Sequence, residues 1–302
     1  MNKKSILYMV LPLAAVVVLW WACTPEKGSP LGTPAQASFS MSGGGDNNTV
    51  VLTNTATSGI PYWSVNGGSI TNGNTDTVSF IFAGTYSVTE YLESHGGLDS
   101  MTQQVTINNN NPTACAEGVQ GFLSGCGGKS WSLDPIAAAE GVGPSPDNTT
   151  WWGNGATEPT TDRVCDWAAT WQFQFNPAFT LVYNNQGSIY ADAYIGLSDN
   201  ACEPNSDVPA NQQAWLSGTF SYKLIPGKGS NPALGQLEVV GLGAHIGVAK
   251  VQNSGDATTN LPVASTTYDI WDTATDAQGH GILTLVILAG STDWWTVVLR
   301  SN

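Results

Sequence analysis

The sequence predicts an all-β protein made of a small β-sandwich followed by a larger one. The chain has 34 Gly in 302 residues, and charged residues make up only 11%, a composition typical of β-rich chains with many turns. Short runs of β-branched and aromatic residues alternate with clusters of Gly, Asn, Pro and Ser, as expected for strands joined by turns. The only helical pattern, at 135–140, is short.

The first 23 residues have the order of a secretory signal peptide. Lys3 and Lys4 form a positive start, an uncharged apolar run covers 6–22, and Cys23 follows. A Cys directly after the small residue Ala22 resembles the bacterial lipobox, whose Cys is lipidated and becomes the mature N-terminus. The alternative is an uncleaved anchor helix, for which the run is short. Both interpretations predict an exported protein that is tethered to a membrane.

Composition divides the chain into four segments. Residues 1–22 are the predicted signal peptide, and 23–36 are the lipidated Cys with a flexible Pro- and Gly-containing tether. A small domain is expected at 37–109. A polar break of four Asn and one Pro ends this domain, and a larger domain is expected at 113–302.

Residues 37–109 contain strand-type runs at the spacing of a small sandwich. These runs lie at 50–52, 62–65, 78–82, 83–89 and 104–107. Three pieces resemble the polycystic-kidney-disease (PKD) domain: Thr53-Asn54, the segment 62–68 with Trp63, and above all Ala-Gly-Thr-Tyr-Ser-Val-Thr at 83–89. The resemblance implies an immunoglobulin-like sandwich that acts as a spacer.

Residues 113–302 predict a larger sandwich. The sequence Trp-Gln-Phe-Gln-Phe at 171–175 alternates cleanly, which places Trp171, Phe173 and Phe175 on one buried face. Further strands are expected at 180–183, 188–194, 216–225, 236–242, 266–271, 282–288 and 295–299. About eight strands with long loops favour a jelly roll.

Four cysteines of the larger domain predict two disulfides, because an exported protein meets an oxidising compartment. They are Cys115, Cys126, Cys165 and Cys202. Of the three pairings that four Cys allow, we favour Cys115–Cys126 and Cys165–Cys202, since short loops keep the partners close. A zinc site is the alternative, but no CxxC spacing or His pair supports it.

The net charge of the chain limits the classes of binding partner that we expect. Removal of 1–22 takes away two Lys and no acidic residue, which leaves 7 basic against 23 acidic groups and a net charge of −16. Recognition of nucleic acid or anionic lipid needs a basic surface, so we expect neither as a partner. The charge fits a neutral ligand, and it also fits simple solubility.

Tryptophan is the strongest functional signal, because nine of the twelve lie in the larger domain. An aromatic face stacks on the C–H patch of a sugar, whose hydroxyl groups bind Asn, Gln or Asp. Neighbours on a strand point to opposite faces, so one member of each pair, Trp151-Trp152 and Trp294-Trp295, should leave the core. We expect ligand contacts from Trp151, Trp152, Trp271, Trp294 and Asp293. Packing is the alternative role for each Trp.

Four motifs carry a second resemblance: Lys-Ser-Trp-Ser-Leu-Asp at 129–134, Gly-Val-Gly-Pro at 141–144, Trp-Trp at 151–152 and Asp-Trp-Trp at 293–295. In this order they resemble Bacteroidetes surface lipoproteins in which a PKD domain precedes a jelly-roll carbohydrate-binding module. The resemblance implies a non-catalytic protein, lipid-anchored in the outer membrane at the cell surface. Such a protein captures polysaccharide, for example a β-glucan, for a starch-utilisation-system-type importer and its lipoprotein partner.

Catalytic signals are weak. The three His form no metal or triad pattern, and no Gly-x-Ser-x-Gly motif occurs. Two carboxylates can hydrolyse a glycoside, so a glycoside hydrolase or lyase with an unrecognised acid pair is the alternative, and a structural or adhesive surface protein is another. No cofactor is expected. A structural Ca²⁺ on Asp147, Asp192 or Asp293 is left open, since oxygen-rich loops suit this ion.

Overall fold

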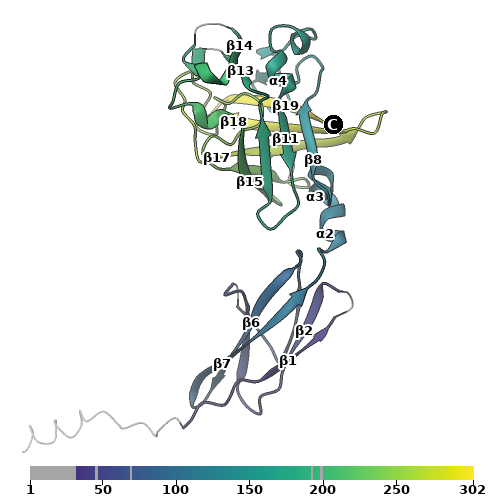
Figure 1. The fold of residues 1–302 in the computed structure, drawn as a ribbon, viewed down its shortest axis with the longest axis vertical. Helices are drawn as coiled ribbons and strands as arrows, with labels where there is room; N and C mark the ends of the chain where they lie inside the picture. Colours follow the sequence, from purple (N-terminus) through teal and green to yellow (C-terminus); the bar gives the residue numbers. More distant parts are fainter. Residues whose placement is uncertain (1–31, 45–46, 69, 192, 198–199) are drawn as a thin grey trace, which may run out of the picture. The chain divides into compact units, whose positions relative to one another are not determined.

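The computed structural model describes residues 32–302 except 45–46, 69, 192 and 198–199. The expected signal peptide, Cys23 and Asp192 lie outside the described residues. The chain divides into two compact units, Met1–Asn110 and Asn111–Asn302, here called unit 1 and unit 2 (Figure 1). Strands dominate both units, so the predicted all-β class is confirmed. No helix of the described part is long and apolar enough to cross a membrane.

Unit 1 is a sandwich of two antiparallel sheets. One sheet has the order β1 (Phe39–Gly43), β2 (Thr49–Asn54), β5 (Thr75–Ser79). The other has the order β4 (Ile70–Asn72), β3 (Ile60–Val65), β6 (Gly84–Ser94), β7 (Gly97–Ile107). Phe39, Val50, Leu52, Trp63, Phe80, Val88 and Ile107 form its core. This is the small sandwich that the sequence predicts.

The motif at 83–89 leads into β6, and its tyrosine fixes the preceding turn. The hydroxyl of Tyr86 donates to the carbonyl oxygen of Phe82 at 2.8 Å, which resembles the tyrosine corner of immunoglobulin-like sandwiches. The strand expected at 78–82 is displaced, because β5 ends at Ser79. Phe80 turns into the core, whereas Ile81 is exposed, so the apolar run there belongs to a turn.

Unit 2 is built around a closed antiparallel barrel (Figure 1). Its strands are β8 (Lys129–Leu133), β11 (Thr170–Phe173), β12 (Thr180–Asn184), β15 (Gly218–Ile225), β16 (Gln236–Val240), β17 (Ser265–Thr275), β18 (Gly281–Ala289) and β19 (Asp293–Ser301). Each strand pairs with the next, and β8 pairs with both β11 and β19, which closes the sheet. The barrel is therefore an up-and-down meander.

This connectivity differs from the expected jelly roll, in which Greek-key connections cross between two sheets. The number and spacing of strands are similar in both architectures. The choice between them depends on long-range pairing, which the spacing does not encode. The inward stripe was predicted correctly, since Trp171, Phe173 and Phe175 are all buried.

Two short additions flank the barrel. The strands β9 (Glu140–Gly143) and β10 (Trp152–Gly153) extend the sheet from the first half of β19. The strands β13 (Ser188–Ala191) and β14 (Ala201–Pro204) form a separate hairpin.

The short helices of unit 2 lie elsewhere than expected. The predicted helix at 135–140 is absent: 135–139 form bends and turns, Ala138 has φ 58°, and Glu140 begins β9. The α-helices are α2 (Pro112–Ala116), α3 (Gly118–Leu123) and α4 (Val164–Ala168). The 3₁₀ helices are η1 (Glu158–Thr160), η2 (Ala193–Ile195), η3 (Asn205–Asp207) and η4 (Gln213–Trp215). The disulfides Cys115–Cys126 and Cys165–Cys202 form as predicted.

Candidate functional site

A pocket of about 250 Å³ lies beside the first half of β19, where β9 and β10 extend the sheet. Its lining comes from six places in the sequence: β9, β10, the start of α4, the β13–η2 segment, the connection from β16 to β17, and β19. The lining residues are Val142, Trp152, Arg163, Tyr190, Tyr194, Val248, Lys250 and Trp295. We call this site the aromatic pocket, because four of its eight residues carry aromatic rings.

Strand register explains why two tryptophans meet in this pocket. Val142 of β9 pairs with Trp152 on one side and with Trp295 on the other. Residues paired across antiparallel strands project to the same face, so all three side chains form one row. The two indole rings are 5.9 Å apart between centroids. Trp295 is nearly buried and forms the deep side of the pocket, whereas Trp152 is 37% exposed.

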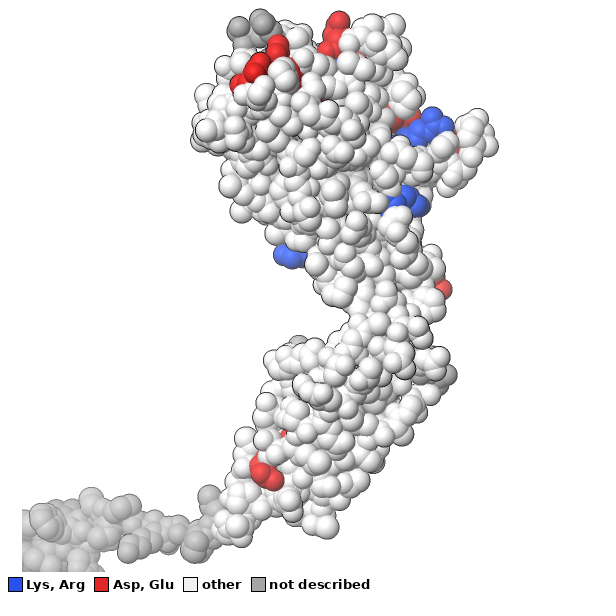
Figure 2. Space-filling model, in the orientation of Figure 1, with Lys and Arg blue, Asp and Glu red and all other residues white. Residues whose placement is uncertain are grey.

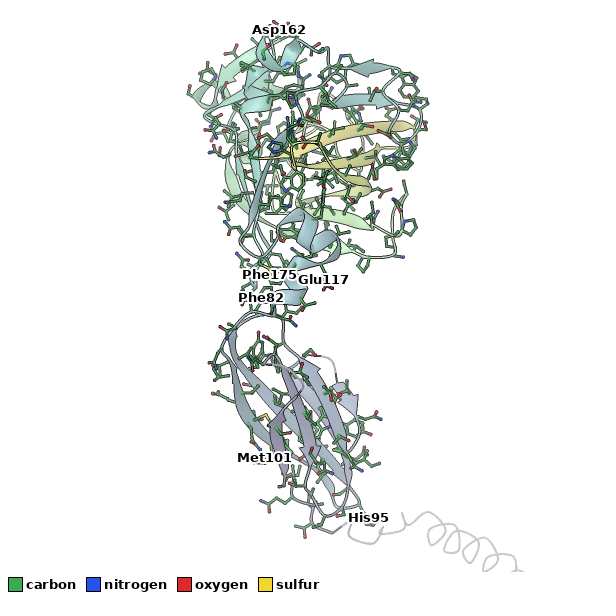
Figure 3. The ribbon with its side chains drawn as sticks, turned by 90° about the vertical axis from the view of Figure 1, so that its right-hand side faces the viewer. Phe82, His95, Met101, Glu117, Asp162 and Phe175 are labelled. Atoms are coloured by element: carbon green, nitrogen blue, oxygen red, sulfur yellow. A yellow bond between two sulfur atoms is a disulfide. The ribbon has the colours of Figure 1, made fainter. Side chains whose placement is uncertain are left out.

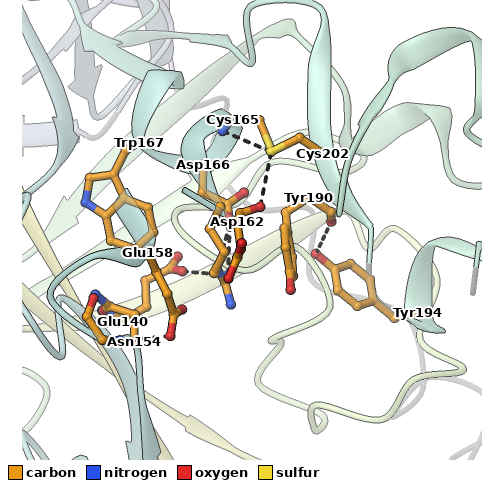
Figure 4. Close-up of polar contacts among 12 residues, drawn as sticks. Glu140, Asn154, Glu158, Asp162, Cys165, Asp166, Trp167, Tyr190, Tyr194 and Cys202 are labelled. Carbon is orange, nitrogen blue, oxygen red and sulfur yellow. Dashed lines mark hydrogen bonds and ion pairs between the residues drawn. A yellow bond between two sulfur atoms is a disulfide. The ribbon is translucent and has the colours of Figure 1, made fainter. Parts of the chain in front are cut away.

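Arg163 connects the pocket to a buried ionic cluster, shown in Figure 4. Its guanidinium donates to Glu140 at 2.9 Å and to Asp166 at 2.8 and 3.0 Å. The same guanidinium lies 4.4 Å from the ring centroid of Tyr190 and 5.3 Å from that of Trp152. A planar guanidinium stacks well on aromatic faces, so Arg163 holds these two rings in place.

Burial is the largest influence on the pKa of the two carboxyl groups in this cluster. It raises the pKa of Glu140 to about 8, against the opposing effect of the positive charge on Arg163. Burial also raises the pKa of Asp166, again opposed by Arg163. For Arg163 itself burial favours the neutral form, but the carboxylates of Glu140 and Asp166 outweigh it and raise the pKa. The guanidinium therefore stays charged in the pocket wall.

The end of the barrel interior beside the pocket is filled by residues 241–251, here called the plug segment. Its peptide groups bond to inward side chains: Trp171 Nε1 donates to the carbonyl oxygen of His245, and the hydroxyl of Tyr268 accepts from Ile246 N. Burial lowers the pKa of His245 to about 4, so this ring is neutral. An eight-stranded barrel can hold one small ligand, but here the chain occupies that space.

The plug segment also brings a second cation to the pocket. Lys250 Nζ lies 5.6 Å from the ring centroid of Tyr194 and 6.0 Å from that of Trp295. Its backbone is fixed, because Asn260 Nδ2 donates to its carbonyl oxygen at 2.8 Å. The ammonium group therefore lies over rings that line the pocket.

The structure separates the five residues expected to bind ligand. Trp152 lines the aromatic pocket, and Trp151 is its exposed neighbour. Trp271 lies opposite 284–285 of β18, whereas Trp294 pairs with Leu288. About three residues of strand therefore separate these two positions, or roughly 10 Å. Asp293 accepts a hydrogen bond from Thr292 and does not line the pocket, so the five residues do not form one site.

Sequence reasoning missed most of the pocket. The side chain of Trp295 was expected to face the core, and it is buried. That it also lines the pocket was not expected. Arg163, Tyr190, Tyr194 and Lys250 were not singled out. For Arg163 and Lys250 the sequence did contain a signal: basic residues are rare, since the chain has only 9 Lys and Arg. On the face shown in Figure 2 charged side chains form separate spots. Two cations lining one pocket are therefore unusual for this chain.

Comparisons with known proteins concern only a small part of the chain. No family model and no curated protein matches it. The PKD1 domain from the Vibrio cholerae metalloprotease PrtV is 24% identical, with 25% of this chain and 99% of that domain covered and a TM-score of 0.23. The PKD1 domain of Vibrio anguillarum Epp is 18% identical, with 26% and 96% covered and a TM-score of 0.23. Both matches fall on a part of the chain similar in size to unit 1, which is a sandwich of a three-stranded and a four-stranded antiparallel sheet.

Within the described ranges no group of three or more His, Cys, Asp or Glu is arranged to hold a metal ion. Asp147 has φ 53°, a left-handed conformation that Asp tolerates in tight turns.

Proposed function

We propose that the protein is a non-catalytic glycan-binding lipoprotein of the cell surface, and that unit 2 binds sugar in the aromatic pocket. The observation that supports this is the convergence of four aromatic rings on one concave site. Its volume of about 250 Å³ is just below the roughly 300–1,000 Å³ of pockets for drug-sized ligands. That size suits one sugar ring or the end of a longer chain.

The acidic groups near the pocket favour binding over hydrolysis. Glu140 and Asp166 both bind Arg163, and neither lines the pocket. A glycosidase needs two carboxyl groups that flank the scissile bond. Because Glu140 and Asp166 are turned toward Arg163 and no carboxyl group of the described residues lines the pocket, we propose that the ligand is held without being cleaved.

The wider setting follows from the resemblance to Bacteroidetes surface lipoproteins. In this proposal Cys23 carries the lipid anchor in the outer membrane, and unit 1 is a spacer. Unit 2 captures polysaccharide for a starch-utilisation-system-type importer and its lipoprotein partner. The protein needs no cofactor for this role.

A panel of polysaccharides in affinity gel electrophoresis tests the proposal, with two tryptophan variants as a matched pair. Trp152→Ala should weaken binding by about 1–3 kcal/mol, the usual contribution of an aromatic stacking partner, or roughly 5- to 150-fold. Trp294→Ala removes the same side chain outside the pocket and should leave the affinity unchanged. Circular dichroism melting checks that both variants fold.

Three other results would contradict parts of this proposal. Retardation by none of the polysaccharides would refute glycan binding. A loss of binding in Trp294→Ala but not in Trp152→Ala would move the site to the outer face of β19. Release of new reducing ends from any polysaccharide would show an enzyme.

A further inference from the structure

Each aromatic ring that lines the pocket already faces a cation. Arg163 lies over Trp152 and Tyr190, and Lys250 lies over Tyr194 and Trp295. A cation on one face of a ring leaves only the other face for the C–H patch of a sugar. The pocket therefore presents positively charged groups, supported by aromatic rings, to whatever enters.

The two cations differ in what neutralises them. Arg163 is bonded to Glu140 and Asp166, and its charge is thereby balanced inside the protein. Lys250 forms no ion pair within 4.0 Å among the described residues. The carboxylate of Asp256 accepts a hydrogen bond from Trp295 Nε1 at 2.8 Å, but it forms no ion pair with Lys250 within 4.0 Å. Among the described residues the ammonium group of Lys250 therefore has no ionic partner and can pair with an anionic ligand.

The remaining lining residues agree with this charge pattern. The ionisable groups that line the pocket are Arg163, Lys250 and two tyrosines, and none of the described lining residues is Asp or Glu. The chain as a whole has a net charge of −14, so a pocket lined by two cations and, among the described residues, by no carboxyl group differs from the rest of its surface. An unpaired ammonium group in such a lining attracts an anionic group at short range, where the attraction is least screened.

We infer that the ligand of the aromatic pocket is an acidic sugar, and that Lys250 binds its carboxylate or sulfate group. This inference rests on the proposed glycan-binding function and specifies its substrate class. It replaces the neutral ligand that the net charge of the chain favours. Lys250 acts as a specificity-determining residue, because an ammonium group paired with an anion forms a stronger hydrogen bond than with a neutral hydroxyl.

Titration calorimetry with the full mature protein tests this inference with three probes of equal length. These are a neutral glucose oligosaccharide, a uronic-acid oligosaccharide and a sulfated oligosaccharide. The wild type should bind at least one acidic probe about 10- to 100-fold more tightly than the neutral one, as expected for a hydrogen bond to a charged group. The probe that binds better identifies the anionic group as carboxylate or sulfate.

Three Lys variants assign the effect to its side chain. Lys250→Gln should lose the preference for the acidic probe, and Lys250→Arg should keep it, because the charge is retained. Lys228→Gln removes a charge at an exposed position of unit 2 and should behave like the wild type. Melting curves of the four proteins show whether each is folded, and Lys250→Met, which also removes the charge, takes the place of Lys250→Gln if that variant does not fold.

The possible failures separate the two proposals. Equal or tighter binding of the neutral probe, unchanged in Lys250→Gln, would overturn the acidic ligand and leave glycan binding intact. An acidic preference that survives in Lys250→Gln would overturn the assignment to Lys250. Binding of neither these probes nor any polysaccharide of the panel would overturn both proposals.

Discussion

The two disulfides of unit 2 offer one covalent link beside the aromatic pocket and one away from it. Cys165–Cys202 joins α4 to β14. Arg163 precedes Cys165 by two residues, and Tyr190 is the strand partner of Cys202. This bridge therefore fixes the two segments whose side chains stack in the pocket at 4.4 Å. Figure 3 places Asp162, next to Arg163, at the opposite end of unit 2 from Glu117, which follows α2.

The loop lengths give the expected loss of stability. A disulfide restricts the unfolded chain, and the effect grows with the loop that it closes. The bridges span sequence separations of 37 and 11 residues. The loop-entropy relation then predicts a cost of about 4 kcal/mol for removing Cys165–Cys202 and about 3 kcal/mol for Cys115–Cys126. In a unit of this size these costs lower the melting temperature by roughly 8–16 °C and 6–12 °C.

The variants Cys165→Ser/Cys202→Ser and Cys115→Ser/Cys126→Ser are compared by denaturant unfolding and by ligand titration, at a temperature where both are folded. Both should be less stable than the wild type. Only the first should also bind more weakly, because only its bridge aligns Arg163 with Tyr190. Equal affinity losses in both variants, or none in the first, would show that the bridge does not organise the site.

Two further predictions concern unit 1 and the anchor. Glu90 is completely buried, and burial raises its pKa, partly offset by the backbone of Ser38. The contribution of Glu90 to the free energy of unfolding of unit 1 is therefore at its full value below pH 4.5, the pKa of this group in the unfolded chain. It falls as pH rises through the higher pKa of Glu90 in the folded state. Glu90→Gln should remove this fall in denaturant titrations of unit 1 between pH 4 and 8, and identical wild-type and variant profiles would refute it. Cys23→Ala should release the protein from membranes, since each buried lipid CH₂ contributes about 0.8 kcal/mol; unchanged fractionation and no fatty-acid label in the wild type would exclude a lipoprotein.

Local patterns predicted those parts of the fold that depend on neighbouring residues. The alternation at 171–175 identified a buried stripe, because a strand repeats every two residues. Short loops identified the pairing of Cys115 with Cys126 and of Cys165 with Cys202. The helix expected at 135–140 does not form. The side chain of Asn154 accepts a hydrogen bond from Glu140 N and donates one to the carbonyl oxygen of Ile136, which holds this segment in a non-helical conformation. Such a contact across 14 and 18 residues has no local signature.

The candidate site was harder to predict because it is assembled from distant segments. Trp152 was identified as one of an adjacent pair, which is a local property. Its partners Tyr190 and Lys250 reach it only through the disulfide-linked hairpin and the plug segment. The sequence offers Trp271 and Trp294 as further candidates for ligand contact, but their positions relative to the pocket depend on register, which places Trp271 opposite 284–285 and Trp294 opposite Leu288.

Closure of the barrel has a consequence for how unit 2 is made. The pairing of Leu133 with Leu299 joins the first strand of the barrel to the last, so a chain that is synthesised from its N-terminus cannot complete the barrel before β19 is released. Until then β8 and β18 each present an unpaired edge, which can recruit another extended chain. Pairing over such a separation is slow to form. We therefore expect unit 2 to depend on chaperones until β19 pairs with β8.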